Sequence, residues 1–74
     1  MVEHTHQAAL ADVIRASRVA LGFSQEGFAD HIQMHRAYYS KIERGEKNVT
    51  LATLERVAKG LGKTMSELLT EAGL

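Results

Sequence analysis

The 74-residue sequence contains no cysteine and no proline, and its apolar runs are short. Without cysteine, disulfide frameworks and zinc sites built from thiolates are excluded, which fits a reducing compartment. No apolar run approaches the roughly 20 residues that a membrane-spanning helix needs. The first residues also lack the basic segment of a secretory signal peptide. We therefore expect an intracellular, cytoplasmic protein with no membrane association.

A net charge is also lacking, because nine lysine and arginine residues balance nine aspartate and glutamate residues. A typical nucleic-acid-binding domain is visibly basic, so the overall charge does not favour DNA binding. The local pattern differs, since residues 36–47 carry four basic residues and two acidic ones. If Glu43 is internal, the outward face of this stretch is cationic. Glu55, Glu67 and Glu71 then place the compensating negative charge away from a polyanion.

Motifs for catalysis and for cofactors are equally scarce. The sequence has no nucleophile motif, no glycine-rich phosphate loop and no pair of carboxylates in a pocket-sized frame. His4 and His6 suggest only slight metal affinity, and a predicted turn separates His31 from His35. A chain of this length also leaves little room for a large catalytic cleft. We expect a protein that is not an enzyme and that uses no metal, cofactor or small-molecule ligand.

Apolar residues instead recur with the spacing of short amphipathic helices. The first helix is predicted over residues 8–21, and its apolar positions are Leu10, Val13, Ile14, Ala16, Ala20 and Leu21. A second helix is predicted over residues 25–32, after the favoured N-cap residue Ser24. Gly27 within it either lets a neighbouring backbone come close or is a tolerated weak point. Residues 1–7 are interpreted as a flexible polar arm.

Three further helices are predicted, over residues 36–44, 51–61 and 65–72. Thr64 and Glu67 form a capping-box pattern at the start of the last one. The inner faces of the last two helices are expected to consist of Leu51, Leu54, Val57, Ala58, Leu61, Met65, Leu68 and Leu69. No strand-like alternation, internal repeat or proline-rich linker interrupts this pattern. The sequence therefore predicts an all-α, compact five-helix domain over residues 8–74.

The second and third predicted helices are separated by a very short break. Apolar or small residues fall where two steeply crossing helices would pack together, at Phe28, Ala29, Ile32, Met34, Tyr39 and Ile42. In this register Tyr39 belongs to the core and its neighbour Tyr38 points outward. The pattern indicates a helix-turn-helix with its polar and basic side chains on one exposed face.

Four pieces of the sequence together resemble the phage-repressor type helix-turn-helix proteins, the Cro/XRE family. They are R-x-x-R-x-x-x-G-x-S-Q from Arg15 to Gln25, the small Ala29, Y-S-x-I-E-R-G from Tyr39 to Gly45, and L-x-x-L-x-x-V-A-x-x-L-G from Leu51 to Gly62. The resemblance covers residues 14–69 and implies a lambda-repressor-like fold that binds double-stranded DNA. The stretch HRAYYSKIERGEKNVTL is most similar to the controller proteins of restriction-modification systems, although Ala37 replaces a hydroxyl residue common there.

A recognition helix fits the major groove, roughly 12 Å wide, when one face offers hydrogen-bond donors and the other is packed. The predicted base contacts are His35, Arg36, Ala37 and Lys41. Arg36 is the first candidate for base reading because its guanidinium pairs with guanine O6 and N7. The alternative for Arg36 is a solvated side chain or a phosphate contact. His35 either caps the helix or touches DNA, and Ala37 at most meets a thymine methyl.

Contacts with the DNA backbone position a protein without reading sequence. The candidates for such contacts are Gln25, Tyr38, Ser40, Arg44, Lys47 and Asn48. Gln25 lies at the positive end of its helix, where a side-chain amide and a backbone N–H are available to a phosphate. The family resemblance also implies a partly buried structural ion pair between Arg18 and Glu43. It further implies a left-handed residue at Gln33, where the family commonly has glycine.

A single recognition helix touches few base pairs, and proteins of this type usually bind as two-fold dimers. Five apolar residues exceed what so small a core needs and are assigned to a homodimer interface, with ordinary core as the alternative: Val49, Leu51, Met65, Leu69 and Leu74. The leading hypothesis is a transcriptional regulator that binds a palindromic operator as a homodimer. The alternative is an antitoxin or another protein-interaction module with the same fold.

Overall fold

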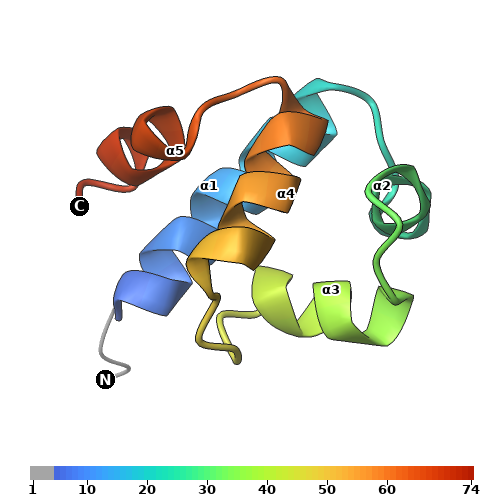
Figure 1. Cartoon of the computed structure of the whole chain (residues 1–74), viewed down its shortest axis with the longest axis horizontal. Coiled ribbons are helices and arrows are strands. Elements are labelled where there is room, and N and C mark those ends of the chain that lie inside the picture. The colour runs from blue at the N-terminus through green and yellow to red at the C-terminus, as the bar shows by residue number, and fades with distance from the viewer. Residues whose placement is uncertain (1–4) are drawn as a thin grey trace.

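The computed structural model describes residues 5–74, which form five α-helices around one apolar core (Figure 1). The helices are α1 (His6–Ala20), α2 (Gln25–His31), α3 (Arg36–Glu43), α4 (Leu51–Leu61) and α5 (Met65–Glu71). Within this described part no strand occurs, so the predicted all-α fold is confirmed. Helix α1 contacts α3, α4 and α5, and α2 contacts α3. Over the same residues, no helix has the length and apolar character needed to cross a membrane.

Hydroxyl side chains fix where four of the helices begin. Ser24 Oγ accepts the backbone N–H of Gly27 at 2.9 Å, and Thr50 caps α4 in the same way. The predicted capping box of Thr64 and Glu67 is present at the start of α5. A Cβ added at Gly27 would lie 2.9 Å from Ser24 Oγ. Glycine at this position therefore leaves room for the capping hydroxyl rather than for a neighbouring backbone.

The prediction of a flexible arm over residues 1–7 is wrong for its last part. Helix α1 begins at His6, because the hydroxyl of Thr5 accepts the backbone N–H of Ala8 at 3.1 Å and caps the first turn. Gln7 is held as well, since its Nε2 donates to Asn48 Oδ1 in the loop between α3 and α4. Residues 1–4, which include His4, lie outside the described residues.

The core draws on all five helices. Its buried members are Leu10, Ile14, Phe28, Ala29, Ile32, Tyr39, Ile42, Leu54, Val57, Ala58, Leu61 and Leu68. The predicted inner faces are thus confirmed for most positions, but Leu51 is 73% exposed and Leu21 is 53% exposed. Ala16 and Ala20 are exposed too. Leu51 is the first residue of α4 and Leu21 follows the last residue of α1, and neither belongs to the buried core cluster.

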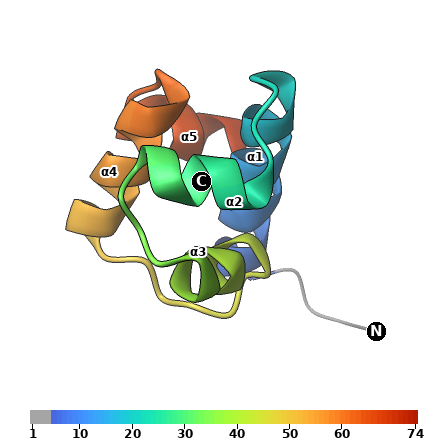
Figure 2. The same cartoon turned by 90° about the vertical axis from the view of Figure 1, so that its right-hand side faces the viewer.

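Helices α2 and α3 form the helix-turn-helix. Figure 1 shows α2 end-on and α3 lengthwise, and Figure 2 shows the reverse, so the two helices cross steeply. In the turn between them, Gln33 has a φ of 55°, which confirms the predicted left-handed residue. The next residue, Met34, donates its backbone N–H to the carbonyl of Ala29 at 2.8 Å. The turn therefore closes against the end of α2 and sets the direction of α3.

Candidate nucleic-acid interface

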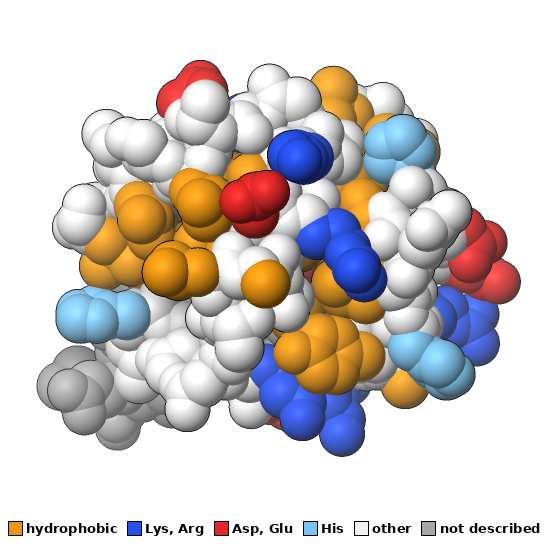
Figure 3. Space-filling model, viewed as in Figure 1, with side chains coloured by type: hydrophobic (Ala, Val, Ile, Leu, Met, Phe, Trp, Pro, Cys, Tyr) orange, Lys and Arg blue, Asp and Glu red, His pale blue; other side chains and the backbone are white. Residues whose placement is uncertain are grey.

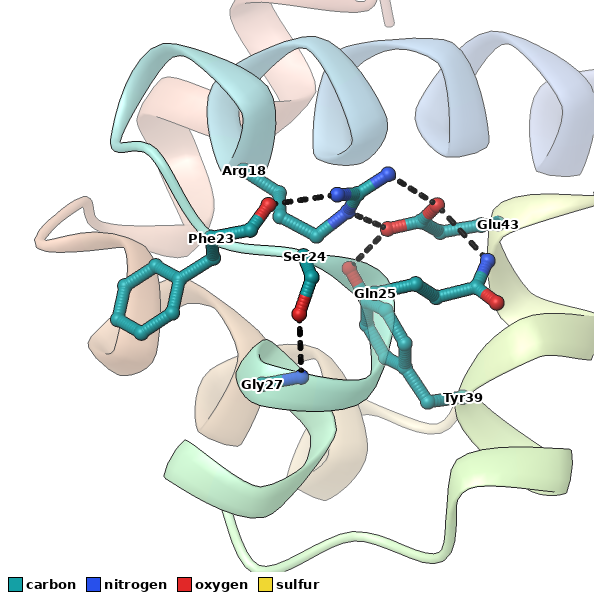
Figure 4. A network of polar contacts seen from close by, with 7 residues as sticks. All are labelled: Arg18, Phe23, Ser24, Gln25, Gly27, Tyr39 and Glu43. Carbon is teal, nitrogen blue, oxygen red and sulfur yellow. Dashed lines mark hydrogen bonds and ion pairs between the residues drawn. The ribbon is translucent and has the colours of Figure 1, made fainter.

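A buried ion pair joins α1 to α3 and holds the helix that carries the candidate site. Arg18 Nε donates to Glu43 Oε2 at 2.6 Å, and Arg18 Nη2 donates to Oε1 at 3.2 Å (Figure 4). The third arm of the guanidinium, Nη1, donates to the carbonyl of Phe23 at 2.7 Å. The side chains of Arg18 and Glu43 are only 11% and 3% exposed. The structural ion pair expected from the family resemblance is confirmed.

Two further side chains bind the same carboxylate. Gln25 Nε2 donates to Glu43 Oε1 at 3.2 Å, and the buried hydroxyl of Tyr39 donates to Oε2. The Gln25 side-chain amide, which is predicted to meet a phosphate, directs one N–H inward to Glu43 (Figure 4), and its phosphate contact stays a prediction. The core position predicted for Tyr39 is confirmed, since the residue is fully buried. Glu43 is therefore held by side chains from α1, α2 and α3.

The network also fixes protonation states. Burial by itself raises the pKa of the Glu43 carboxyl, but hydrogen bonds from Arg18, Tyr39 and Gln25 outweigh it, so the pKa lies below its ordinary value. The hydrogen bond to Glu43 raises the pKa of the Arg18 guanidinium. Burial, together with the hydrogen bond to Glu43, raises the pKa of the Tyr39 hydroxyl. At neutral pH the carboxylate is charged and both of these partners keep their protons.

The outer face of α3 carries the predicted base contacts. Arg36, Ala37, Lys41 and the cap residue His35 are all exposed, and Ala37 and Lys41 lie on the side opposite the buried Tyr39 and Ile42. At about 100° per residue, Ala37 lies near the middle of this exposed face. His35 occupies the N-cap of α3, but its side chain makes no capping hydrogen bond. The capping role that was left open for His35 is therefore wrong.

Arg36 is not isolated in the structure. Its Nη1 lies 2.8 Å from Glu26 Oε2, and both side chains are more than half exposed, at 63% and 66%. Glu26 belongs to the first turn of α2 and Arg36 is the first residue of α3. The ion pair thus bridges the beginnings of the two helices of the helix-turn-helix. Sequence reasoning missed Glu26, because only the fold brings these two helix starts together.

Apart from Gln25 at the start of α2, the residues predicted to contact the DNA backbone lie on α3 and in the loop that follows it. Lys47 Nζ lies 5.4 Å from the ring centroid of Tyr38, which is half-buried rather than fully outward. Arg44 Nε pairs with Glu46 Oε2 at 2.8 Å. Asn48 uses its Oδ1 to accept the bond from Gln7. The loop is therefore held by contacts within it and by contacts with Gln7 of α1 and Tyr38 of α3.

The charge of this face follows from these pairings. Glu43 is internal, as the predicted cationic face requires. Among the residues described, neither Lys41 nor Lys47 forms an ion pair, whereas Arg36 and Arg44 each have a carboxylate partner. Lysine and arginine side chains gather at the lower edge of the view in Figure 3, over α3 and the loop after it. A locally basic surface therefore exists on a chain without net charge.

The residues predicted for a dimer interface largely come together. A hollow of about 260 Å³ is lined by His6, Gln7, Leu10, Asn48, Val49, Leu51, Leu54, Leu69 and Leu74. Hydrophobic side chains gather over α5 and the start of α4, at the left of Figure 3. Met65 does not line the hollow but packs, half-buried, against the core. Four of the five predicted residues thus share one apolar surface.

No group of three or more histidine, aspartate or glutamate side chains within residues 5–74 is arranged to hold a metal ion. His31 stacks on Phe23 instead, with ring centroids 4.9 Å apart.

The steep crossing of α2 and α3, the closed turn and the exposed donors of α3 define a helix-turn-helix protein. Residues 14–68 match the helix-turn-helix family HTH_3, of the Cro/XRE type, and the chain belongs to this family. The predicted family is therefore confirmed.

The resemblance to controller proteins is confirmed as well. The chain is 52% identical over 48 residues to the Control protein C.MunI of Mycoplasma sp, a match covering 65% of this chain and 65% of that protein. It is 43% identical over 65 residues to the Control protein C.SmaI of Serratia marcescens, covering 88% and 77%. Among solved structures, the restriction-modification controller protein C.AhdI of Aeromonas hydrophila has a TM-score of 0.79 at 32% identity, covering 84% and 94%. The controller protein C.Esp1396I tetramer in complex with its natural 35 base-pair operator has a TM-score of 0.81 at 30% identity, covering 97% and 100%.

Proposed function

We propose that this chain is a sequence-specific transcriptional regulator of the restriction-modification controller type, which binds a palindromic operator as a homodimer. The observation that carries the proposal is the exposed face of α3, with Arg36, Ala37 and Lys41 outward while Tyr39 and Ile42 are buried. A helix with one packed face and one donor-bearing face is what the major groove accepts. The tetramer of C.Esp1396I, which is bound to its operator, supports the same use of the fold.

Each exposed side chain of α3 has a role in this proposal. Arg36 pairs with a guanine, and Lys41, one turn further along, reaches a second acceptor on a base edge. Ala37 contacts a thymine methyl and, because its side chain is small, lets the helix approach the groove closely. His35 precedes the helix and donates to a base edge at the rim of the groove.

Phosphate contacts come from the flanks of the same face. Ser40, Arg44, Lys47 and Tyr38 donate to the backbone on one side. The Nδ2 group of Asn48 donates as well, because the bond from Gln7 occupies its Oδ1 and turns the amide nitrogen away. Gln25 contributes only its backbone N–H at the start of α2, since its side chain binds Glu43.

The homodimer uses the apolar hollow between α1, α4 and α5. Leu51 and Leu74 are 73% and 48% exposed, which is unfavourable for leucine in water, and Val49 and Leu69 line the same hollow. In such a dimer we expect the two α3 helices to meet half-sites about 34 Å apart, one turn of the duplex. If such a dimer neutralises about eight phosphates, the logarithm of affinity falls with the logarithm of salt concentration at a slope of about −7. A nearly flat salt response contradicts the phosphate contacts.

Selection of bound sequences from a random pool of duplex DNA tests the proposal. We expect the wild-type chain to enrich a site with two-fold symmetry. Arg36→Ala is expected to lose the preference at one base position in each half-site, a loss of about 1–3 kcal/mol in discrimination. Lys59→Ala is the matched control, because Lys59 is an exposed cation on α4 that pairs with Glu55. Enrichment of no sequence by the wild-type chain contradicts the proposed function.

A further inference from the structure

We propose that Glu26 is a positioning residue for Arg36, and that it helps to decide which base pair the start of α3 reads. This inference rests on the proposed function, because it concerns how a base-reading arginine is aimed. The observation behind it is the ion pair between Arg36 Nη1 and Glu26 Oε2 at 2.8 Å. This pair spans two helices, whereas Arg44 pairs with Glu46 only two residues away in the same segment.

The backbone that carries Glu26 is held in place by the N-cap of α2 and by the hydrogen bonds around the buried Glu43. Helix α2 is capped by Ser24, whose Oγ accepts from Gly27 at 2.9 Å, and is tied to α3 by the bond from Gln25 to Glu43 at 3.2 Å. Tyr39 of α3 also packs against Phe28 of α2, with ring centroids 5.3 Å apart. The two helix starts therefore keep a fixed relation, and Glu26 offers Arg36 a partner in one place.

Because the guanidinium is planar, its contact with Glu26 also fixes the orientation of the Arg36 side chain. Arginine presents five N–H donors in a planar group, and Glu26 takes the outer donor Nη1. The edge formed by Nε and Nη2 stays available, and two donors in a row match guanine O6 and N7. An arginine without this partner is free to swing to a neighbouring phosphate, a contact that carries no sequence information.

Charge acts in the same direction. A carboxylate beside the recognition helix repels phosphates wherever the protein lands, so it weakens binding to all DNA. The aimed arginine recovers part of that loss only on the correct base. Glu26 thus raises the ratio of operator binding to unrelated binding while it lowers general affinity, which is selectivity obtained through a repulsive element.

The experiment compares Glu26→Gln with Asp30→Asn in the full chain. Asp30 lies four residues after Glu26 on the same face of α2, is exposed, and forms no ion pair with a described residue, so Asp30→Asn removes one charge without touching Arg36. Affinity is measured for the selected operator and for an unrelated duplex of equal length. Both variants are expected to bind the unrelated duplex about twofold more tightly, because one negative charge is lost.

Only Glu26→Gln is expected to lower the ratio of operator affinity to unrelated affinity, by about twofold to fivefold, the range of an exposed ion pair. It should also broaden the base preference at the position that Arg36→Ala affects. In an Arg36→Ala background, Glu26→Gln is expected to leave this ratio unchanged, because the guanidinium that Glu26 would position is absent.

Three results overturn the inference. The ratios of Glu26→Gln and Asp30→Asn are equal, or the effect of Glu26→Gln persists without Arg36, or the wild-type chain selects no operator. The last result overturns the proposed function too. In the first two results the wild-type chain still selects an operator, so the proposed function stands while the positioning role fails.

Discussion

At the scale of single residues, the buried carboxylate of Glu43 concentrates more hydrogen bonds than any surface residue of the site. We expect Arg18→Ala to lower the free energy of unfolding by about 3–5 kcal/mol, because it leaves this carboxylate charged and without its main partner. Small domains have stabilities of about 5–15 kcal/mol, so the variant is close to unfolding. Urea titration followed by circular dichroism measures the change.

Arg15→Ala is the matched control for Arg18→Ala. Arg15 also belongs to α1 and pairs with a carboxylate, Asp12, but both side chains are about half exposed, at 53% and 54%. Its loss should cost no more than about 1 kcal/mol. An Arg18→Ala variant that unfolds within about 0.5 kcal/mol of the wild type would mean that the buried pair contributes little.

The lowered pKa of Glu43 predicts sensitivity to acid. Because the folded-state value lies below the unfolded value, about 4.3 for glutamate, the charged carboxylate stabilises the fold above that pH. This stabilisation is lost as the pH falls through the folded-state value. The urea midpoint should therefore hold between pH 7 and pH 5 and fall below about pH 4.

Two variants assign this acid sensitivity to Glu43. Glu43→Gln should be less stable at neutral pH and should show a shallower fall below about pH 4. Glu55→Gln, which alters a carboxylate that is 54% exposed on α4, should keep the slope of the wild type. Equal slopes for the wild type and Glu43→Gln would assign the acid sensitivity to other groups.

Gln33 carries backbone strain that a single substitution removes. Its φ of 55° is unfavourable for a residue with a Cβ, and glycine has no such penalty. Glycine also gains freedom in the unfolded chain, which offsets part of this benefit, so Gln33→Gly should be neutral or stabilising by up to about 1 kcal/mol. Thermal melting measures the difference.

Gly62→Ala is the reverse control for Gln33→Gly. Gly62 has a φ of 70°, and a Cβ there would meet nothing within 4 Å, so alanine adds backbone strain alone. It should destabilise the fold by about 1–2 kcal/mol. Clear destabilisation by Gln33→Gly would show that the side chain of Gln33, rather than its backbone, stabilises the turn.

The sequence predicted whether a side chain is buried or exposed better than it predicted the partner to which that side chain binds. Tyr39 was placed in the core from its spacing, and the pair of Arg18 with Glu43 followed from the family resemblance. Gln25 was assigned to a phosphate because the amide at a helix start suits an anion equally well. Only the fold shows that Glu43 is near enough to take this amide.

At the scale of helices, capping residues predicted the starts of α2, α4 and α5 correctly. The ends differ by one residue in α1, α2, α3 and α5, as expected where the last turn loosens. The predicted start of α1 lies two residues too late, because the sequence analysis places Thr5 in a polar arm. Leu51 and Ala16 were wrongly placed inside, since apolar spacing does not reveal which helix faces a neighbour covers.

The sequence also did not predict a close contact between α4 and the end of α2. A Cβ added at Gly60 would lie 2.3 Å from Ile32 Cγ2 and 3.1 Å from Phe28 Cζ, both on buried side chains. Alanine favours a helix by about 1 kcal/mol over glycine, but overpacking costs about 1–3 kcal/mol. We expect Gly60→Ala to lower the melting temperature despite its better helix propensity.

The double variant of Gly60→Ala with Ile32→Ala tests the cause. Ile32→Ala removes the Cγ2 methyl that the new Cβ would meet, so the double variant should be less destabilised than the sum of the single variants. Additive losses would place the strain elsewhere. A stabilised Gly60→Ala would show that α4 shifts at little cost.

At the scale of the whole molecule, the charged side chains are distributed unevenly although the net charge is zero. Among residues 5–74, the lysines without a carboxylate partner, Lys41 and Lys47, lie on α3 and in the loop after it. Lys59 pairs with Glu55 on α4, and Lys63 pairs with Glu71 at 2.7 Å. The basic surface on and after α3 could be predicted from the sequence, because counting the charged residues within 36–47 was sufficient. The pairing of Arg36 with Glu26 needed the fold.

The apolar hollow is the proposed contact between two copies of the chain. Leu51→Glu should give a monomer at micromolar concentration where the wild type sediments as a dimer, because a charge would enter the centre of the proposed interface. The variant should still fold, since Leu51 is 73% exposed and glutamate is favourable in the first turn of a helix. Operator affinity should fall by more than about tenfold once the half-sites are bound independently.

Val19→Glu is the matched control for this prediction. Val19 is 60% exposed, almost as much as Leu51, but belongs to the last turns of α1 and does not line the hollow. This variant should sediment and bind operator as the wild type does. A wild-type chain that is monomeric with and without operator would show that the proposed dimer does not form. A dimer that Val19→Glu disrupts and Leu51→Glu leaves intact would place the two-fold contact on another surface. Either result would contradict the proposed interface, because two α3 helices meet adjacent grooves only when one defined face pairs with itself.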